Sequence, residues 1–65
     1  MTGPSAILAG KAILVVEDDR LLSPLLQTIL EDAGAKVKTA GDPNEAVRLA
    51  KAMSRIDVLV SDVVL

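Results

Sequence analysis

The hydrophobic pattern along the chain predicts three strands. Residues 12–16 (AILVV) are all apolar and rich in β-branched side chains, which is typical of a strand covered on both faces. Residues 36–40 (KVKTA) alternate polar and apolar positions, which predicts an edge strand with one solvent-exposed face. Its lysines discourage pairing with another strand. Residues 57–65 (DVLVSDVVL) predict a third strand, apolar on both faces until Asp62.

Two amphipathic segments lie between these strands and predict helices. Residues 22–33 carry apolar side chains at three- and four-residue steps, after Asp19 or Ser23 as a possible cap and before Gly34 as a stop. Residues 42–45 (DPNE) are a strong helix start, with Asp as the N-cap, Pro in the first position and Glu in the third.

The resulting order is β-α-β-α-β, which predicts an α/β fold with a three-stranded parallel sheet. Right-handed crossovers place the helices on the faces of the sheet. Residues 1–10 contain Gly3, Pro4 and Gly10 and are interpreted as a flexible leader, which leaves residues 11–65 as the folded domain.

Four acidic residues stand where they interrupt the apolar pattern. Glu17, Asp18 and Asp19 close the first strand, and Asp62 lies in the otherwise apolar third segment. With strand order 2-1-3 the carboxyl ends of strands 1 and 3 flank the crevice where open α/β sheets bind ligands. Because like charges in one crevice repel, a hard cation such as Mg²⁺ would stabilise them, and Asp62 could then attack a phosphorus atom.

Composition excludes several other kinds of chemistry. The 65 residues contain no Cys, no His and no aromatic side chain, so disulfides, thiolate or histidine catalysis and base stacking on rings are excluded. The net charge of −2 argues against a nucleic-acid or anionic-membrane surface. No apolar run approaches the ~20 residues of a membrane span, and the start is a poor signal peptide, so we expect a cytoplasmic protein.

Two motifs carry a resemblance to a known family. Residues 13–19 (ILVVEDD) and 57–65 (DVLVSDVVL), with the helix, strand and helix between them, resemble the bacterial response-regulator receiver domain. The resemblance covers residues 11–65 and implies half of a flavodoxin-like receiver fold. It implies phosphorelay signal transduction by a module that is not itself an enzyme.

The resemblance also implies a role for individual residues. Glu17 and Asp18 correspond to the acidic pair that holds Mg²⁺, and Asp62 corresponds to the aspartate that accepts a phosphoryl group. The donor would be a histidine kinase or a phosphotransfer protein. The backbone carbonyl of Val64 corresponds to a further metal ligand, whereas Asp19 fits a helix cap better than a ligand.

The chain departs from the family in its extent. A receiver has five strands and five helices in about 120 residues, and this chain matches the first three strands only. We therefore expect a truncated receiver in which switching is lost and the open edge of the third strand pairs in a homodimer. The ending resembles receivers of hybrid histidine kinases, and whether Leu65 is a natural end stays open.

Two alternatives remain beside the receiver interpretation. One is a dimerising structural or interaction fragment that performs no chemistry. The other is a metal-dependent phosphatase with an aspartyl-phosphate intermediate. It ranks last because such sites require a second Asp at the position where this chain has Val64.

Overall fold

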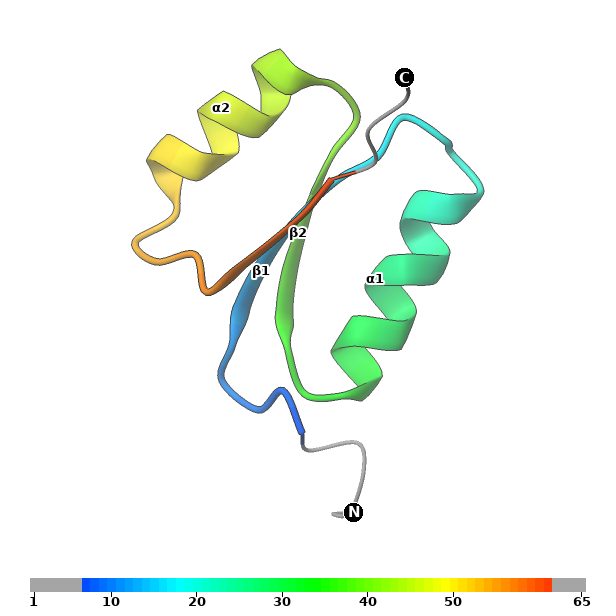
Figure 1. The fold of residues 1–65 in the computed structure, drawn as a ribbon, viewed down its shortest axis with the longest axis vertical. Coiled ribbons are helices and arrows are strands. Elements are labelled where there is room, and N and C mark those ends of the chain that lie inside the picture. The colour runs from blue at the N-terminus through cyan, green and yellow to red at the C-terminus, as the bar shows by residue number, and fades with distance from the viewer. Residues whose placement is uncertain (1–6, 62–65) are drawn as a thin grey trace.

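A three-stranded parallel sheet with a helix on each face forms the fold (Figure 1). The structure is a computed structural model and describes residues 7–61 of the chain. The strand order is β2-β1-β3, which confirms the predicted α/β class and topology. The elements are β1 (Ala12–Val16), α1 (Leu22–Asp32), β2 (Lys36–Ala40), α2 (Pro43–Ala52) and β3 (Val58–Ser61).

The central strand β1 carries the core. Ile13, Leu14 and Val15 are at most 2 % exposed, because β1 is paired on both edges and covered on both faces. This confirms the prediction of a strand buried on both faces.

The two faces of the sheet have different coverings. On the α1 face, Ile13 and Val15 pack with apolar residues of β2, β3, α1 and the turn before β2, namely Val37, Val60, Leu26, Leu30 and Ala35. Leu8 joins this cluster, and its backbone N–H donates to the Ala33 carbonyl at 2.7 Å, so the segment before β1 is docked onto the end of α1. On the α2 face, Leu14 and Val16 lie beside the small side chains of α2.

The edge strand β2 has the predicted alternation. Val37 and Ala40 are buried, whereas Lys36 and Lys38 are exposed. The turn before β2 uses Gly34, whose φ of +100° is a left-handed conformation that favours glycine, as predicted for the stop of α1.

The other edge strand, β3, is open to solvent. Val58 and Leu59 are 41 % and 60 % exposed, and Val60 is half-buried. Within residues 7–61 no strand pairs with its outer edge. The predicted third strand continues to residue 65, and residues 62–65 lie outside the described part of the chain.

A polar link ties the amino ends of β1 and β3 together. Asp57 Oδ2 accepts hydrogen bonds from the Ala12 N–H at 2.8 Å and from Arg55 Nε at 3.1 Å. Arg55 also donates through a terminal guanidinium nitrogen to the Gly10 carbonyl at 2.6 Å. The sequence pattern gave no sign of this link.

Both helices leave apolar surface uncovered. Neither α1 nor α2 contains a fully buried residue, and Leu25, Ile29 and Val47 are each more than half exposed. No helix in the described residues has the length and apolar character required to cross a membrane.

Candidate functional site

A hollow of about 260 Å³ lies at the carboxyl ends of β1 and β3. Glu17 and Asp18 line it from the segment after β1, and Ser61 lines it from the end of β3. The remaining lining residues are Val16 and residues 41–43, which lead into α2. The hollow therefore stands where the predicted crevice of a 2-1-3 sheet should be.

Glu17 is the buried acid of this site. Its side chain is only 6 % exposed, and its Oε2 accepts a hydrogen bond from the Asp19 N–H at 3.1 Å. Its own N–H donates to the Ala40 carbonyl at 2.9 Å, which continues the pairing with β2 beyond the end of β1. Glu17 is thus held at a fixed place beside the exposed Asp18.

Asp19 closes the start of α1. Its Oδ1 accepts hydrogen bonds from the N–H groups of Leu21 at 2.8 Å and Leu22 at 3.1 Å. These two backbone donors lower the pKa of the Asp19 carboxyl, because they stabilise its charged form. Asp19 therefore closes the turn that leads into α1, whose N-cap position is Leu21, and the other predicted cap, Ser23, lies inside the helix.

The start of α2 forms another wall of the hollow. Asp42 Oδ1 accepts from the Glu45 N–H at 2.8 Å, which confirms Asp42 as the N-cap. Glu45 Oε1 in turn accepts from the Gly41 N–H at 2.7 Å, one residue earlier than in a standard capping box. The sequence predicted this helix start but did not place it at the site.

The predicted site residues divide into two groups. Glu17 and Asp18 are brought together in one hollow, whereas Asp62 and Val64 lie outside the described residues. Among residues 7–61 there is no group of three acidic, His or Cys side chains that could hold a metal ion. Ser61 is a lining residue that the sequence did not single out, although it directly precedes Asp62.

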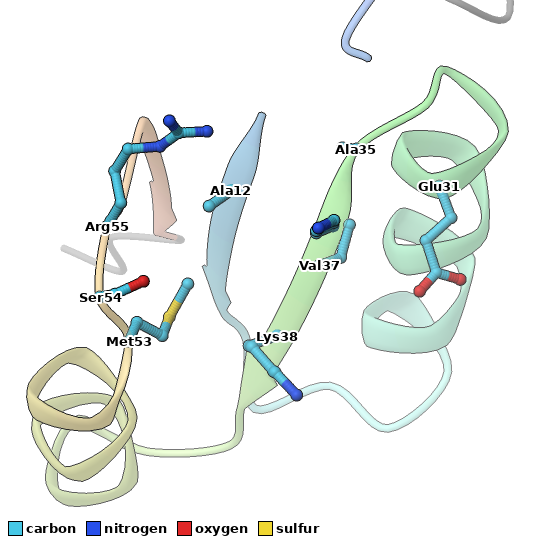
Figure 2. A pocket seen from close by; sticks show the side chains of 9 residues that line it. Ala12, Glu31, Ala35, Val37, Lys38, Met53, Ser54 and Arg55 are labelled. Atoms are coloured by element: carbon cyan, nitrogen blue, oxygen red, sulfur yellow. The ribbon is translucent and has the colours of Figure 1, made fainter. Parts of the chain in front are cut away.

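Another hollow, of about 620 Å³, lies away from these acids and is shown in Figure 2. It runs past the edge strand β2, between the segment that follows α2 and the end of α1. Lys36, Lys38 and Arg55 line it together with Met53 and Glu31. It contains neither Glu17 nor Asp18, so it is separate from the acidic hollow.

Comparison with known proteins identifies the family. Residues 13–65 match the response regulator receiver domain, so the chain belongs to that family. Receiver domains take part in phosphorelay signalling, generally as modules without enzyme activity of their own. They typically bind Mg²⁺ and interact with histidine kinases or phosphotransfer proteins. No curated protein and no solved structure matches the chain.

Proposed function

We propose that this chain is a receiver module in which Asp62 accepts a phosphoryl group beside Mg²⁺ held by Glu17 and Asp18. The observation that carries the proposal is the hollow that Glu17 and Asp18 share with Ser61. Val16 and Ser61 are Cα partners in the parallel pairing of β1 with β3. The residues that follow them in the chain are Glu17 and Asp62, so the register supports a common site.

The chemistry of the donors fits the cation. Mg²⁺ prefers oxygen ligands and is usually bound by one or two carboxylates, waters and a phosphate oxygen. Glu17 and Asp18 would supply the carboxylates, and we propose Asp62 and the Val64 carbonyl as the further ligands. When bound, Mg²⁺ would neutralise charge on the transferring phosphoryl group.

The proposed reaction is a direct phosphoryl transfer. A carboxylate oxygen of Asp62 forms a bond to phosphorus while the bond from phosphorus to the donor breaks. With a histidine kinase or a phosphotransfer protein, the leaving group is the imidazole nitrogen of the donor. The product is an acyl phosphate on Asp62.

Acetyl phosphate with Mg²⁺, followed by intact mass measurement, tests this proposal. We expect a gain of about 80 Da, which corresponds to one phosphoryl group. Asp62→Asn should show no gain, and Asp18→Asn should reduce it because one metal ligand is lost. An unchanged mass for the unmodified sequence, with the protein shown to be folded, would rule out phosphorylation of this chain by that donor.

The domain boundaries, the cellular location and the parent protein are further proposals. We propose that residues 11–65 form the receiver unit and that residues 1–10 form a leader, of which Leu8 is docked against the core and the end of α1. We also propose a cytoplasmic location and a parent protein of the hybrid histidine kinase type, because the phosphodonor would be a histidine kinase or a phosphotransfer protein.

An open strand edge favours a second candidate function, a homodimeric interaction module. The strand β3 contains no charged residue, whereas β2 carries Lys36 and Lys38 along the opposite edge. An uncharged, apolar and unpaired edge tends to pair with another strand. A two-fold axis would make β3 pair antiparallel with β3 of a second copy.

Size-exclusion chromatography with light scattering tests the dimer. We expect a mass near twice the 6.8 kDa of one chain at micromolar concentration. A folded species with the mass of a single chain would contradict this second candidate, and it would leave the phosphorelay proposal untouched.

A further inference from the structure

The hollow of about 620 Å³ in Figure 2 follows the outer edge of β2. Met53 and Arg55 line it on the α2 side of the sheet, and Glu31 lines it on the α1 side. Within residues 7–61 no strand pairs with this edge. In the flavodoxin-like order 2-1-3-4-5 further strands add beyond β3, so β2 remains an edge strand in a complete receiver sheet.

The backbone of β2 presents hydrogen-bonding groups at this edge. The Lys36 N–H donates to the Lys11 carbonyl at 2.8 Å, and the Ala40 carbonyl accepts a bond from the residue after β1 at 2.9 Å. The even-numbered residues of β2 are therefore directed toward β1. Because successive residues of a strand alternate in direction, Val37 and Thr39 present their N–H and C=O groups at the outer edge.

Two lysines give the hollow its unpaired positive charge. Lys38 lies on the α2 face of the sheet beside its Cα partner Leu14, and Lys36 lies two residues earlier on the same face. Both lysines are exposed, and neither makes an ion pair within residues 7–61. Arg55 also lines the hollow, but its guanidinium is paired with the Asp57 carboxylate at 3.1 Å.

The other face of β2 differs in character. Val37 is 8 % exposed and packs into the core on the α1 face. Glu31 stands on that side, and its Oε2 accepts a hydrogen bond from Gln27 Nε2 at 3.2 Å. A strand laid along β2 would therefore meet positive charge on the α2 face and an apolar surface with one acid on the α1 face.

We infer that the β2 edge binds an extended acidic segment of a partner protein, which adds to the sheet as a further strand. Acidic residues at every second position of that segment face Lys36 and Lys38, because the side chains of a strand alternate between faces. The residues between them are apolar and lie on the side of Val37 and Glu31. Opposite charges on neighbouring strands stabilise their pairing, whereas a second copy of β2 would set lysine against lysine.

The edge favours a peptide over a small anion as the occupant. A small anion such as inorganic phosphate would contact the two lysines only. An extended segment also pairs with the backbone groups of Val37 and Thr39, and it covers the apolar part of the lining, which includes Ala12 and Met53. This inference is independent of the proposed phosphoryl transfer, because none of these residues lines the acidic hollow.

Fluorescence anisotropy of a short peptide in which Glu and Val alternate, labelled with an uncharged fluorophore, tests the inference. We expect saturable binding that weakens as salt is added, because the lysines are exposed and their charges are screened. A peptide of the same composition, in which all Glu residues precede all Val residues, is the matched control. It should bind about ten-fold more weakly, because it cannot direct its acids to one face.

Charge-removing variants locate the binding site. Lys36→Gln combined with Lys38→Gln should weaken binding of the alternating peptide about ten-fold. Arg48→Gln combined with Lys51→Gln removes the same charge from exposed positions of α2 that do not line the hollow, and it should change the affinity less than about two-fold. Circular dichroism of both double variants shows that the fold is retained.

Amide hydrogen exchange measured by NMR separates strand addition from simple attraction between charges. On saturation with the alternating peptide, we expect the Val37 and Thr39 amides to exchange more slowly, because they become hydrogen-bonded. Inorganic phosphate at the same ionic strength should leave both exchange rates unchanged.

Several results would overturn the inference. These are no binding of the alternating peptide, equal binding of the two peptides, equal losses in the two double variants, and unchanged exchange at Val37 and Thr39. Slower exchange of these amides with phosphate alone would make the occupant a small anion and would also overturn it. Each of these results leaves phosphorylation of Asp62 untouched, because acetyl phosphate and intact mass measure that reaction separately.

Discussion

At the scale of single residues, three aspartates each accept backbone hydrogen bonds at the junction of two elements. Asp19 receives the N–H groups of Leu21 and Leu22 at the start of α1, Asp42 receives an N–H of α2, and Asp57 receives the first N–H of β1. Charged acceptors of this kind make the stronger class of hydrogen bond. These hydrogen bonds fix the starts of α1, α2 and β1, and Glu17 and Asp18 lie between β1 and α1.

Two of these carboxyls make stability depend on pH. The Ala12 N–H is the main cause that lowers the pKa of Asp57, with nearby Arg55 and Lys11 adding to it, and the Leu21 and Leu22 N–H groups lower that of Asp19. A carboxyl whose pKa is lower in the folded state than in the unfolded state stabilises the fold at pH values above its unfolded pKa. That stabilisation is lost as the pH falls below about 4, through the pKa of the folded state.

We therefore predict that Asp57→Asn is less stable than the unmodified sequence at pH 7 and that the difference is smaller at pH 2. Asn keeps an acceptor oxygen, so the substitution isolates the effect of the charge. Thermal unfolding followed by circular dichroism at both pH values measures it. A difference that stays constant from pH 7 to pH 2 would contradict the role assigned to the Asp57 charge.

The residue-scale features differ in how far the sequence predicts them. The hydrogen bonds that Asp19 and Asp42 accept follow from local spacing, because each partner lies two or three residues further along the chain. The link from Asp57 to Ala12 spans 45 residues and depends on the register of β3 against β1. A local pattern carries no information on that register, so this link was not predicted.

At the scale of elements, burial is concentrated in one strand. Ile13 in β1 is 1 % exposed, whereas Ile29 in α1 is 55 % exposed. The periodicity predicted both the strand and the helix, because a fully apolar run and a three-to-four-residue repeat are strong local signals. It did not show that the helix would remain uncovered along Leu25 and Ile29, since that depends on what lies beside it in space.

The same substitution at these two positions should have different effects. We expect Ile13→Val to lower the free energy of unfolding by about 1 kcal/mol, because it leaves a small cavity in the core. Ile29→Val is the matched control and should change it by less than about 0.5 kcal/mol. Urea unfolding of both variants compares them, and equal losses would mean that the core is not centred on β1.

At the scale of the whole molecule, the two edges of the sheet differ within residues 7–61. Lysines stand along β2, and β3 presents uncharged valines and a leucine. The parallel direction of the strands was predictable from the β-α-β-α-β pattern and its crossovers, and the edge position of β2 from its polar alternation. The acidic hollow was predictable as a place, because parallel strands bring their carboxyl ends to one edge. Ser61 and the start of α2 also line the hollow, but this depends on the detailed packing at that edge and was not predictable.

We propose that acids far apart in the chain serve one cation site. A titration with Mg²⁺ followed by ¹H–¹⁵N correlation spectra tests this site. We expect saturable shifts of the Glu17, Asp18 and Asp62 amides with a single midpoint, and a midpoint at a higher Mg²⁺ concentration for Asp62→Asn. Shifts confined to acids elsewhere, such as Glu31 and Asp32, or no saturable shift at Glu17 and Asp18, would contradict it.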